Sequence, residues 1–385
     1  MYQLTNFDPS YFLENYWQKK PIILKGVFQD FVDPIDENEL AGLSEEDQVD
    51  SRIVSCQNST WQVNHGPFED INEHCIGAWS LLVQAVDHFL PEADQLMRAF
   101  DFIPIWRMDD LMVSFSNKGA GVGPHLDQYD VFIIQGKGSR RWQVGLPGDF
   151  DVNNPHKDLS QISAFEPIID QVLLPGDVIY IPANHPHNGV ALEECLNYSV
   201  GFRGPSQQEM LSSLADFAID NNLFNERYKD DALVPRDLSG EIKQQEVEKF
   251  KYMLQQVLET DQFSDWTAQF LSQGGEKQQP DEQDIQNFSL HDIDDKLKRG
   301  VLFIRCPGVK AVFVEQQTHN IQYFTFYIQG EAFSVPLEGR DLVTEFLNHP
   351  FFQLQNTDSD SNQVSMYFSQ LVATLVNTGY WYPDD

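Results

Sequence analysis

The sequence predicts an α+β protein built around a double-stranded β-helix, or jelly-roll, that ends near residue 205. Short apolar runs typical of strands recur in this region, at residues 111–116, 131–134, 178–182 and 197–202. A turn at residues 174–177 leads into one of these runs, which stops at Pro182 immediately before two histidines. A strand–loop–strand unit with a histidine at its mouth is typical of the jelly-roll fold.

The first hundred residues are expected to form an α+β segment ahead of the jelly-roll. Asp36 and Glu39 have the spacing of a capping box, which predicts a helix at residues 36–43. The other elements expected here are a helix at 10–17, a strand at 21–24, a hairpin at 52–55 and 60–65, and a helix at 79–89.

Beyond the jelly-roll, composition divides the chain into three parts. Residues 206–272 carry apolar residues at helical spacing. Residues 273–284 are rich in Gly, Gln and acidic residues and predict a linker. Residues 285–385 mix helices and strands, with helices expected at 292–299, 340–347 and 363–377.

The overall composition limits the kinds of protein that this chain can be. The net charge of −34 argues against direct binding to nucleic acid and suits a basic partner or general surface acidity. The four cysteines are widely spaced and form no CxxC pair, as expected of reduced thiols in a cytoplasmic protein. The sequence contains no run of 18 apolar residues, so no membrane span is expected.

Three residues have the pattern of a metal site. His125 and Asp127 are two positions apart, so in an extended segment both side chains project to one side. His187, far along the chain, supplies a second imidazole. Two histidines and one carboxylate on one face of a metal leave the opposite face open, as in non-haem Fe(II) oxygenases. The sequence therefore predicts His125, Asp127 and His187 as metal ligands, with His185 as the alternative second histidine.

The chain resembles the JmjC (cupin-type) 2-oxoglutarate oxygenases, and in particular their bacterial ribosomal oxygenase branch. The resemblance is carried by the segments YWQKKPIILK at 16–25, WRMDDLM at 106–112, GPHLDQYDVF at 123–132 and NYSVGFR at 197–203. It implies a hydroxylase that uses Fe(II), 2-oxoglutarate and O2 to modify C3 of an arginine in large-subunit ribosomal protein L-sixteen, releasing succinate and CO2. It also implies that residues 206–272 form a homodimer and that residues 285–385 are winged-helix-like. The family pattern around Pro182 and Pro186 favours His187 over His185.

An enzyme that uses 2-oxoglutarate must bind a dicarboxylate, and the planar fork of arginine suits a carboxylate. The family places a basic residue on the strand after the His-x-Asp loop, where Arg140 stands. Arg141 should point to the opposite face of that strand, and Lys137 in the preceding turn is the second choice.

Three small polar residues are also candidates for the cosubstrate site. Ser114 and Ser116 share one strand face, which could bring both hydroxyls near the cosubstrate. Asn197 lies on the strand that returns from His187 and could contact a cosubstrate carboxylate or a bound water.

The sequence offers several candidates for the residue that would bind the substrate. An arginine side chain would need a carboxylate, and the nearby candidates are Asp109, Asp110 and Asp130, among which the sequence does not choose. A lysine demethylase of the same superfamily would share every metal ligand. A non-catalytic metal-binding scaffold or a cupin isomerase would have no need of Arg140.

Overall fold

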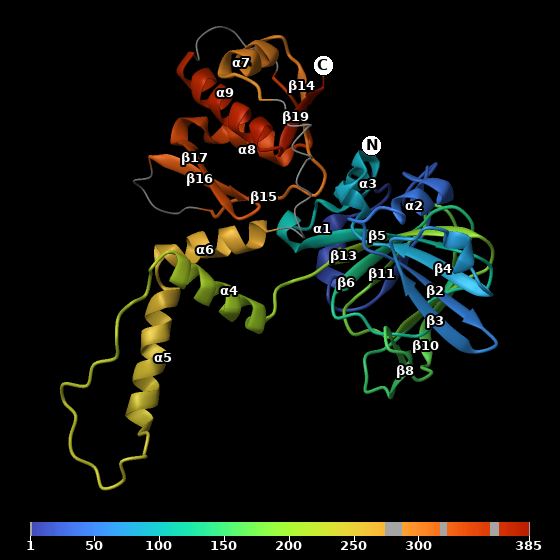
Figure 1. Cartoon of the computed structure of the whole chain (residues 1–385), viewed down its shortest axis with the longest axis horizontal. Coiled ribbons are helices and arrows are strands. Elements are labelled where there is room, and N and C mark those ends of the chain that lie inside the picture. The colour runs from blue at the N-terminus through green and yellow to red at the C-terminus, as the bar shows by residue number, and fades with distance from the viewer. Residues whose placement is uncertain (1, 274–286, 316–321, 355–361, 385) are drawn as a thin grey trace. The chain divides into compact units, whose positions relative to one another are not determined.

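The computed structural model describes residues 2–273, 287–315, 322–354 and 362–384, and the chain forms two compact units (Figure 1). The first comprises residues 1–204 with 306–308, and the second comprises residues 205–305 with 309–385. The linker predicted at residues 273–284 lies, except for Gln273, outside the described residues.

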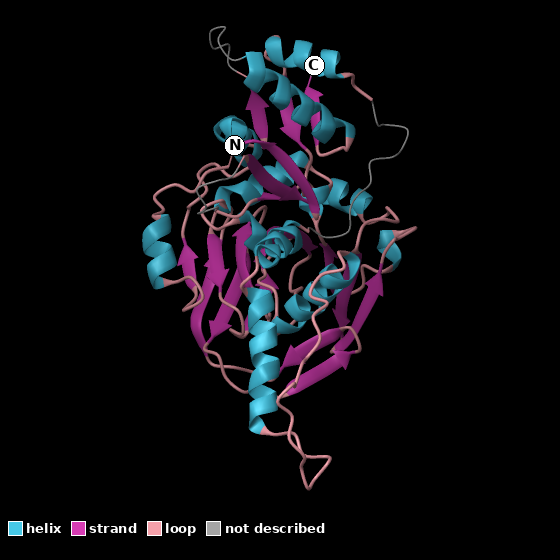
Figure 2. Cartoon of the chain, turned by 90° about the vertical axis from the view of Figure 1, so that its left-hand side faces the viewer, coloured by secondary structure: helices cyan, strands magenta, loops and turns pink. Residues whose placement is uncertain are grey.

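The largest sheet of the first unit has eight strands. Figure 2 draws all strands of the chain in magenta. The neighbouring strands of this sheet are antiparallel. Their spatial order is β1 (Ile22–Leu24), β11 (Val178–Ile181), β6 (Asp130–Gln135), β13 (Cys195–Phe202), β5 (Met108–Ser116), β4 (Ala78–Val83), β2 (Ser51–Gln57) and β3 (Thr60–His65). The N-terminal strands β1 to β4 therefore extend the sheet of the predicted jelly-roll.

A second, smaller sheet packs on the first. It contains β10 (Pro167–Leu173), β7 (Arg140–Gly145) and β12 (His187–Ala191). Apolar side chains from both sheets form one cluster, which includes Ile133 and Ile179 from the large sheet and Trp142 and Val144 from the small one. A hairpin of β8 (Val152–His156) and β9 (Leu159–Ile162) completes the strands of this unit. The predicted double-stranded β-helix is thus confirmed.

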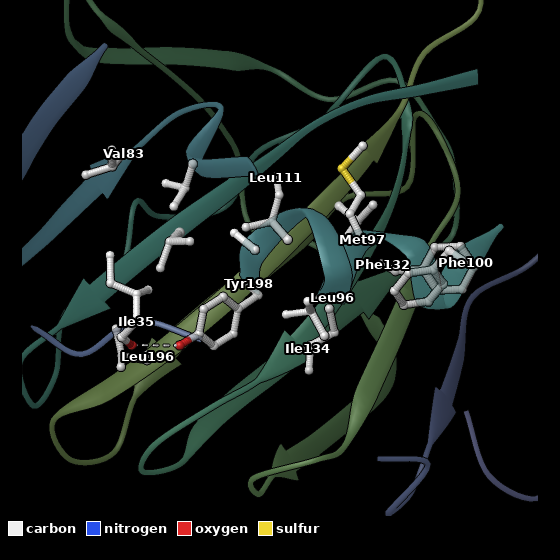
Figure 3. Packing of buried hydrophobic residues seen from close by; sticks show 14 of the residues in the cluster. Ile35, Val83, Leu96, Met97, Phe100, Leu111, Phe132, Ile134, Leu196 and Tyr198 are labelled. Carbon is white, nitrogen blue, oxygen red and sulfur yellow. Dashed lines mark hydrogen bonds between the residues drawn. The ribbon is translucent and has the colours of Figure 1, made fainter. Parts of the chain in front are cut away.

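Strand β6 shows why the sequence runs are continuously apolar. Val131 and Ile133 face the small sheet, whereas Phe132 and Ile134 belong to the core on the other face of the large sheet. Phe132 is fully buried, and its ring centroid lies 4.5 Å from that of Phe100 (Figure 3). A strand buried on both faces needs apolar residues at every position, so period-two alternation is lost.

The N-terminal helices contribute to the core that contains Phe132 and Ile134. They are α1 (Pro9–Asn15), α2 (Glu37–Leu43) and α3 (Pro91–Met97). The capping box predicted for α2 is present, since the Asp36 carboxylate accepts from the backbone N–H of Glu39 and the Glu39 side chain accepts from the backbone N–H of Asp36. Figure 3 shows Tyr198 from β13 reaching the same region, where its hydroxyl donates to the Ile35 carbonyl at 3.1 Å.

The prediction of a helix at residues 79–89 is wrong. Residues 78–83 form strand β4, which pairs with β2 on one side and β5 on the other. A central strand buried on both faces carries an apolar run that periodicity cannot distinguish from a buried helix. The strand ends before Ala85, whose left-handed φ of 50° precedes a single 3-10 turn at Val86–His88.

The second unit combines helices with two small sheets. Its helices are α4 (Gln207–Asp220), α5 (Gln244–Leu258), α6 (Asp261–Ser272), α7 (Leu290–Lys298), α8 (Arg340–Asn348) and α9 (Asn362–Asn377). One sheet has the order β18 (Phe351–Gln353), β14 (Leu302–Arg305), β19 (Trp381–Asp384), and the other has β15 (Ala311–Val312), β16 (Tyr323–Ile328), β17 (Glu331–Pro336). The helix and strand types expected in this part of the chain agree with these elements. The dimerisation and winged-helix assignments stay predictions.

Within the described ranges, none of the helices has the length and apolar character needed to cross a membrane.

Candidate metal and cosubstrate site

The three predicted metal ligands lie together. His125 and Asp127 are on the loop between β5 and β6, and His187 is the first residue of β12. One potential ligand atom from each lies within 4.8 Å of the others. Nε2 of His187 is 3.5 Å from Asp127 Oδ2, and Nε2 of His125 is 3.9 Å from Asp127 Oδ1. Two imidazole nitrogens and one carboxylate oxygen form a donor set that fits Fe(II) and leaves one face open.

The backbone holds the two histidines side by side. The N–H of His125 donates to the His187 carbonyl and the N–H of His187 donates to the His125 carbonyl, both at 3.0 Å. The Nδ1 atoms lie 2.9 Å from the Gly123 carbonyl and 3.0 Å from the His185 carbonyl, respectively. A carbonyl can only accept, so both Nδ1 atoms donate in the neutral tautomer that leaves Nε2 free for a metal.

The electrostatics favour the protonation states that bind a metal. Burial, reinforced by neighbouring His187, lowers the pKa of His125 to about 4. Burial acts to raise the pKa of Asp127, but its contacts with the neighbouring imidazoles of His187 and His125 outweigh this effect and hold that pKa below its usual value. At neutral pH the site therefore offers a neutral His125 imidazole and an ionised Asp127 carboxylate.

The three residues line a cavity of about 270 Å³ in the interior of the jelly-roll. Strand alternation builds its wall: Asp110, Met112 and Ser114 of β5 line the cavity, whereas Leu111 and Val113 face the apolar core. The same alternation places Asn197, Ser199 and Gly201 of β13 on the cavity side.

Arg140 lies inside this cavity. It is 6% exposed, donates from Nη2 to Ser116 Oγ, and its guanidinium carbon is 5.8 Å from the centre of the Trp142 ring. Its Nε is buried and has no hydrogen-bond partner among the described residues. A buried donor on a guanidinium without an acceptor fits a site built for a carboxylate from a ligand.

The predicted small polar residues lie around Arg140. Ser116 is fully buried behind it and also bonds Ser80 Oγ at 2.7 Å. Ser114 lines the cavity and pairs directly with Asn197 across β5 and β13. The Asn197 amide donates to Gln135 Oε1 at 2.8 Å, which fixes its orientation at the cavity wall.

The alternatives from the sequence lie elsewhere. Arg141 points away from the cavity and pairs with Asp170 on a half-exposed surface. Exposed Lys137 pairs with partly buried Glu37. His185 is buried, with Nδ1 3.2 Å from the Ala183 carbonyl, and does not belong to the three-residue ligand group.

The three candidate carboxylates for a substrate have different surroundings. Asp110 lines the cavity, Asp109 is exposed, and Asp130 is buried where it accepts from the Tyr180 hydroxyl at 2.7 Å. Burial, together with the charges of Asp87 and Asp109, raises the pKa of Asp110 to about 6.

Several cavity residues were not identified from the sequence. They are Arg52 on β2, Gln84 after β4, Tyr129 on the loop before β6, and Asp158 and Gln161 of the β8–β9 hairpin. Burial and the charges of Asp127 and Asp110 raise the pKa of Tyr129, so its phenol stays protonated. Tyr129 stands two positions after Asp127 on the same loop, whereas no local motif marks the other four, which reach the cavity through the pairing of the N-terminal strands and the position of the hairpin.

Sequence comparison identifies relatives over the whole chain. The JmjC domain family matches residues 95–210. The ribosomal protein uL16 3-hydroxylase of Escherichia coli (strain K12) is 42% identical over 384 residues, which cover 99% of each protein. A probable ribosomal oxygenase of Haemophilus influenzae is 38% identical over 216 residues, which are 54% of this chain and 53% of that protein.

Solved structures are similar over the same extent. The X-ray structure of E. coli ycfD is 40% identical with a TM-score of 0.89, and the alignment covers 100% of both chains. The structure of YcfD, a ribosomal oxygenase from E. coli, in complex with cobalt and 2-oxoglutarate is 39% identical with a TM-score of 0.87, again covering 100% of both chains.

Proposed function

Because the chain belongs to the JmjC-domain ribosomal oxygenases, we propose that it hydroxylates C3 of an arginine side chain in ribosomal protein uL16, using Fe(II), 2-oxoglutarate and O2. The observation that supports this function is that the metal-ligand candidates His125, Asp127 and His187 line the same cavity as the buried guanidinium of Arg140. A structural metal site alone would have no use for that guanidinium.

His125, Asp127 and His187 are proposed to hold the iron. The support is their grouping, the backbone bridge between the two histidines, and the Nδ1 hydrogen bonds that direct both Nε2 atoms to one point. With one carboxylate and two neutral imidazoles, the protein contributes a single negative charge, which leaves Fe(II) with a net positive charge to attract an anionic cosubstrate.

Arg140 is proposed to bind the carboxylate of 2-oxoglutarate that lies away from the metal. Ser116 anchors one guanidinium nitrogen, so the remaining donors are pre-oriented at low entropic cost. Ser114 and Asn197 line the adjoining wall and are proposed to contact the same cosubstrate.

Asp110 is proposed to bind the guanidinium of the substrate arginine. It is the one of the three candidate carboxylates that lines the cavity, and its pKa of about 6 leaves it largely ionised at neutral pH. A cationic partner would remove the cost of burying this charge. Asp130 is already occupied by Tyr180 and Gln18.

When bound, iron with 2-oxoglutarate and O2 supplies the oxidising chemistry, and succinate and CO2 are released. The chain's own residues determine which C–H bond is presented. Asp110 and the apolar side chains of Met112 and Leu126 line the cavity together with the metal ligands. They would hold the aliphatic part of an arginine between the carboxylate and the open face of the metal.

The partners follow from this substrate. The net charge of −34 favours a basic ribosomal protein over nucleic acid, and a ribosomal substrate implies a cytoplasmic enzyme.

We also propose a homodimer formed through the helical part of residues 206–272. Exposed apolar residues of α5 support it, namely Val247, Phe250, Leu254 and Leu258. Sedimentation velocity of the full chain tests this proposal, and a monomer at micromolar concentration would contradict it.

Iron-dependent conversion of 2-oxoglutarate to succinate tests the proposed chemistry. The wild-type chain should turn over 2-oxoglutarate with Fe(II), and faster with a uL16 fragment. His187→Ala should lose this activity, whereas His185→Ala, two residues away, should retain it if the protein remains folded by circular dichroism. Turnover without stimulation by uL16 would keep the oxygenase and discard the substrate. Formaldehyde released from methyl-lysine peptides would indicate the demethylase alternative.

A further inference from the structure

The β8–β9 hairpin contacts the loop that carries His125 and Asp127, and Gln161 makes a side-chain hydrogen bond to that loop. Gln161 lies on β9, is 6% exposed and lines the cavity. Its Nε2 donates to the Val122 carbonyl at 2.8 Å across a separation of 39 residues. A carbonyl can only accept, so the amide nitrogen of Gln161 must face the loop.

The contact continues directly to a metal-ligand candidate. Gly123 has a left-handed φ of +84°, and a Cβ on it would lie 2.2 Å from Gln161 Nε2. The Gln161 amide therefore packs against the Gly123 backbone, where any larger residue would displace it. The carbonyl of Gly123 is the acceptor for His125 Nδ1 at 2.9 Å. The Gln161 amide thus contacts the Val122–Gly123 peptide, and the next peptide, Gly123–Pro124, supplies the carbonyl that accepts from the imidazole.

On its other side, the loop contacts the backbone of β12. A Cβ on Gly121 would lie 2.2 Å from the Gly189 carbonyl oxygen of β12, and the Ala191 N–H donates to the Ala120 carbonyl at 2.9 Å. On the hairpin side, the Ile162 N–H donates to the Pro124 carbonyl at 2.9 Å. The segment between Ala120 and His125 therefore lies between β12 and β9, and Gln161 is the side chain of β9 that donates a hydrogen bond to it.

We propose that Gln161 is a positioning residue for the metal centre. It holds the Val122–Gly123 peptide in place, so that the next carbonyl, that of Gly123, accepts from His125 Nδ1 and directs Nε2 toward the metal. This role rests on the proposed metal site. Groups that orient a metal ligand typically change metal affinity by about 10–100-fold. Gln161 does not contact His125 itself but acts through the backbone at Gly123, so we expect the low end of that range, about tenfold.

The test is the binding of Co(II) to the full chain, measured by its visible absorption in the presence of 2-oxoglutarate under nitrogen. Two variants remove the donor: Gln161→Met preserves length, and Gln161→Glu preserves shape but places a carboxylate against the Val122 carbonyl. Asn153→Ala is the matched control, because Asn153 is opposite Gln161 in the hairpin and its side chain is exposed.

Both Gln161 variants should raise the Kd for Co(II) about tenfold and alter the absorption bands, while the metal-free unfolding temperature stays close to that of the wild type. Asn153→Ala should bind as the wild type does. Unchanged affinity and bands in the Gln161 variants would overturn the proposal. So would an equal loss in Asn153→Ala, or a large fall in metal-free stability in both Gln161 variants. A wild-type chain that binds no Co(II) would instead overturn the metal site itself.

Discussion

Replacement of Arg140 by Met should weaken 2-oxoglutarate binding by about 100-fold or more. A charge-assisted hydrogen bond contributes about 1.5–3 kcal/mol, so loss of a bidentate pair costs at least about 3 kcal/mol, and each 1.4 kcal/mol is a factor of about ten. Arg140→Lys keeps the charge but loses the fork geometry, and should fall between the wild type and Arg140→Met. The fold should persist, because Ser116 retains its hydrogen bond to Ser80.

The assay is the Kd for 2-oxoglutarate by calorimetry with Mn(II) under nitrogen, with the KM from succinate production as a second measure. Arg141→Met is the matched control, since Arg141 is the neighbouring residue on the same strand but pairs with Asp170 outside the cavity. It should bind 2-oxoglutarate as the wild type does. A Kd for Arg140→Met within threefold of the wild type would refute the assignment of Arg140 to the cosubstrate.

Two further variants test the substrate site and the core. The pKa of Asp110 is raised to about 6 in the folded chain. Between about pH 4 and pH 6 the folded chain therefore keeps a proton on Asp110 that the unfolded chain has released. The contribution of Asp110 to the free energy of unfolding consequently falls as the pH rises through this range. Asp110→Asn should therefore raise the unfolding temperature at neutral pH but not near pH 4. The same variant should raise the KM for uL16, and an unchanged KM would exclude Asp110 from substrate binding. Phe132→Ala removes a fully buried ring and should lower the free energy of unfolding by about 3–5 kcal/mol in urea titrations. Exposed Ile168→Ala is its control, and a loss below about 1 kcal/mol would contradict the packing described for β6.

The parts of this molecule that sequence could predict are those that short-range rules determine. The capping box of Asp36 and Glu39 depends on residues three apart and was predicted correctly. The His125–Asp127 spacing, together with a distant His187, predicted three residues that the structure brings within 4.8 Å.

The parts that sequence could not predict depend on strand pairing. The apolar run of strand β4 predicts a helix, because a strand covered on both faces lacks the alternation that identifies a strand. Arg52, Gln84 and Gln161 belong to the cavity only because the N-terminal strands and the β8–β9 hairpin lie against it. The choice of Asp110 over Asp109 and Asp130 likewise needed the register of β5 and the partners of Asp130.

The central claim is that this cavity directs iron-dependent hydroxylation to an arginine of uL16. The most direct test is intact-mass spectrometry of recombinant uL16 after incubation with the full chain, Fe(II), 2-oxoglutarate and O2, with His125→Ala run in parallel. A gain of one oxygen atom that is absent with His125→Ala, and that tandem mass spectrometry maps to C3 of an arginine, is the predicted result. Unmodified uL16 from a chain that converts 2-oxoglutarate to succinate, or an oxygen mapped to another residue type, would contradict the claim.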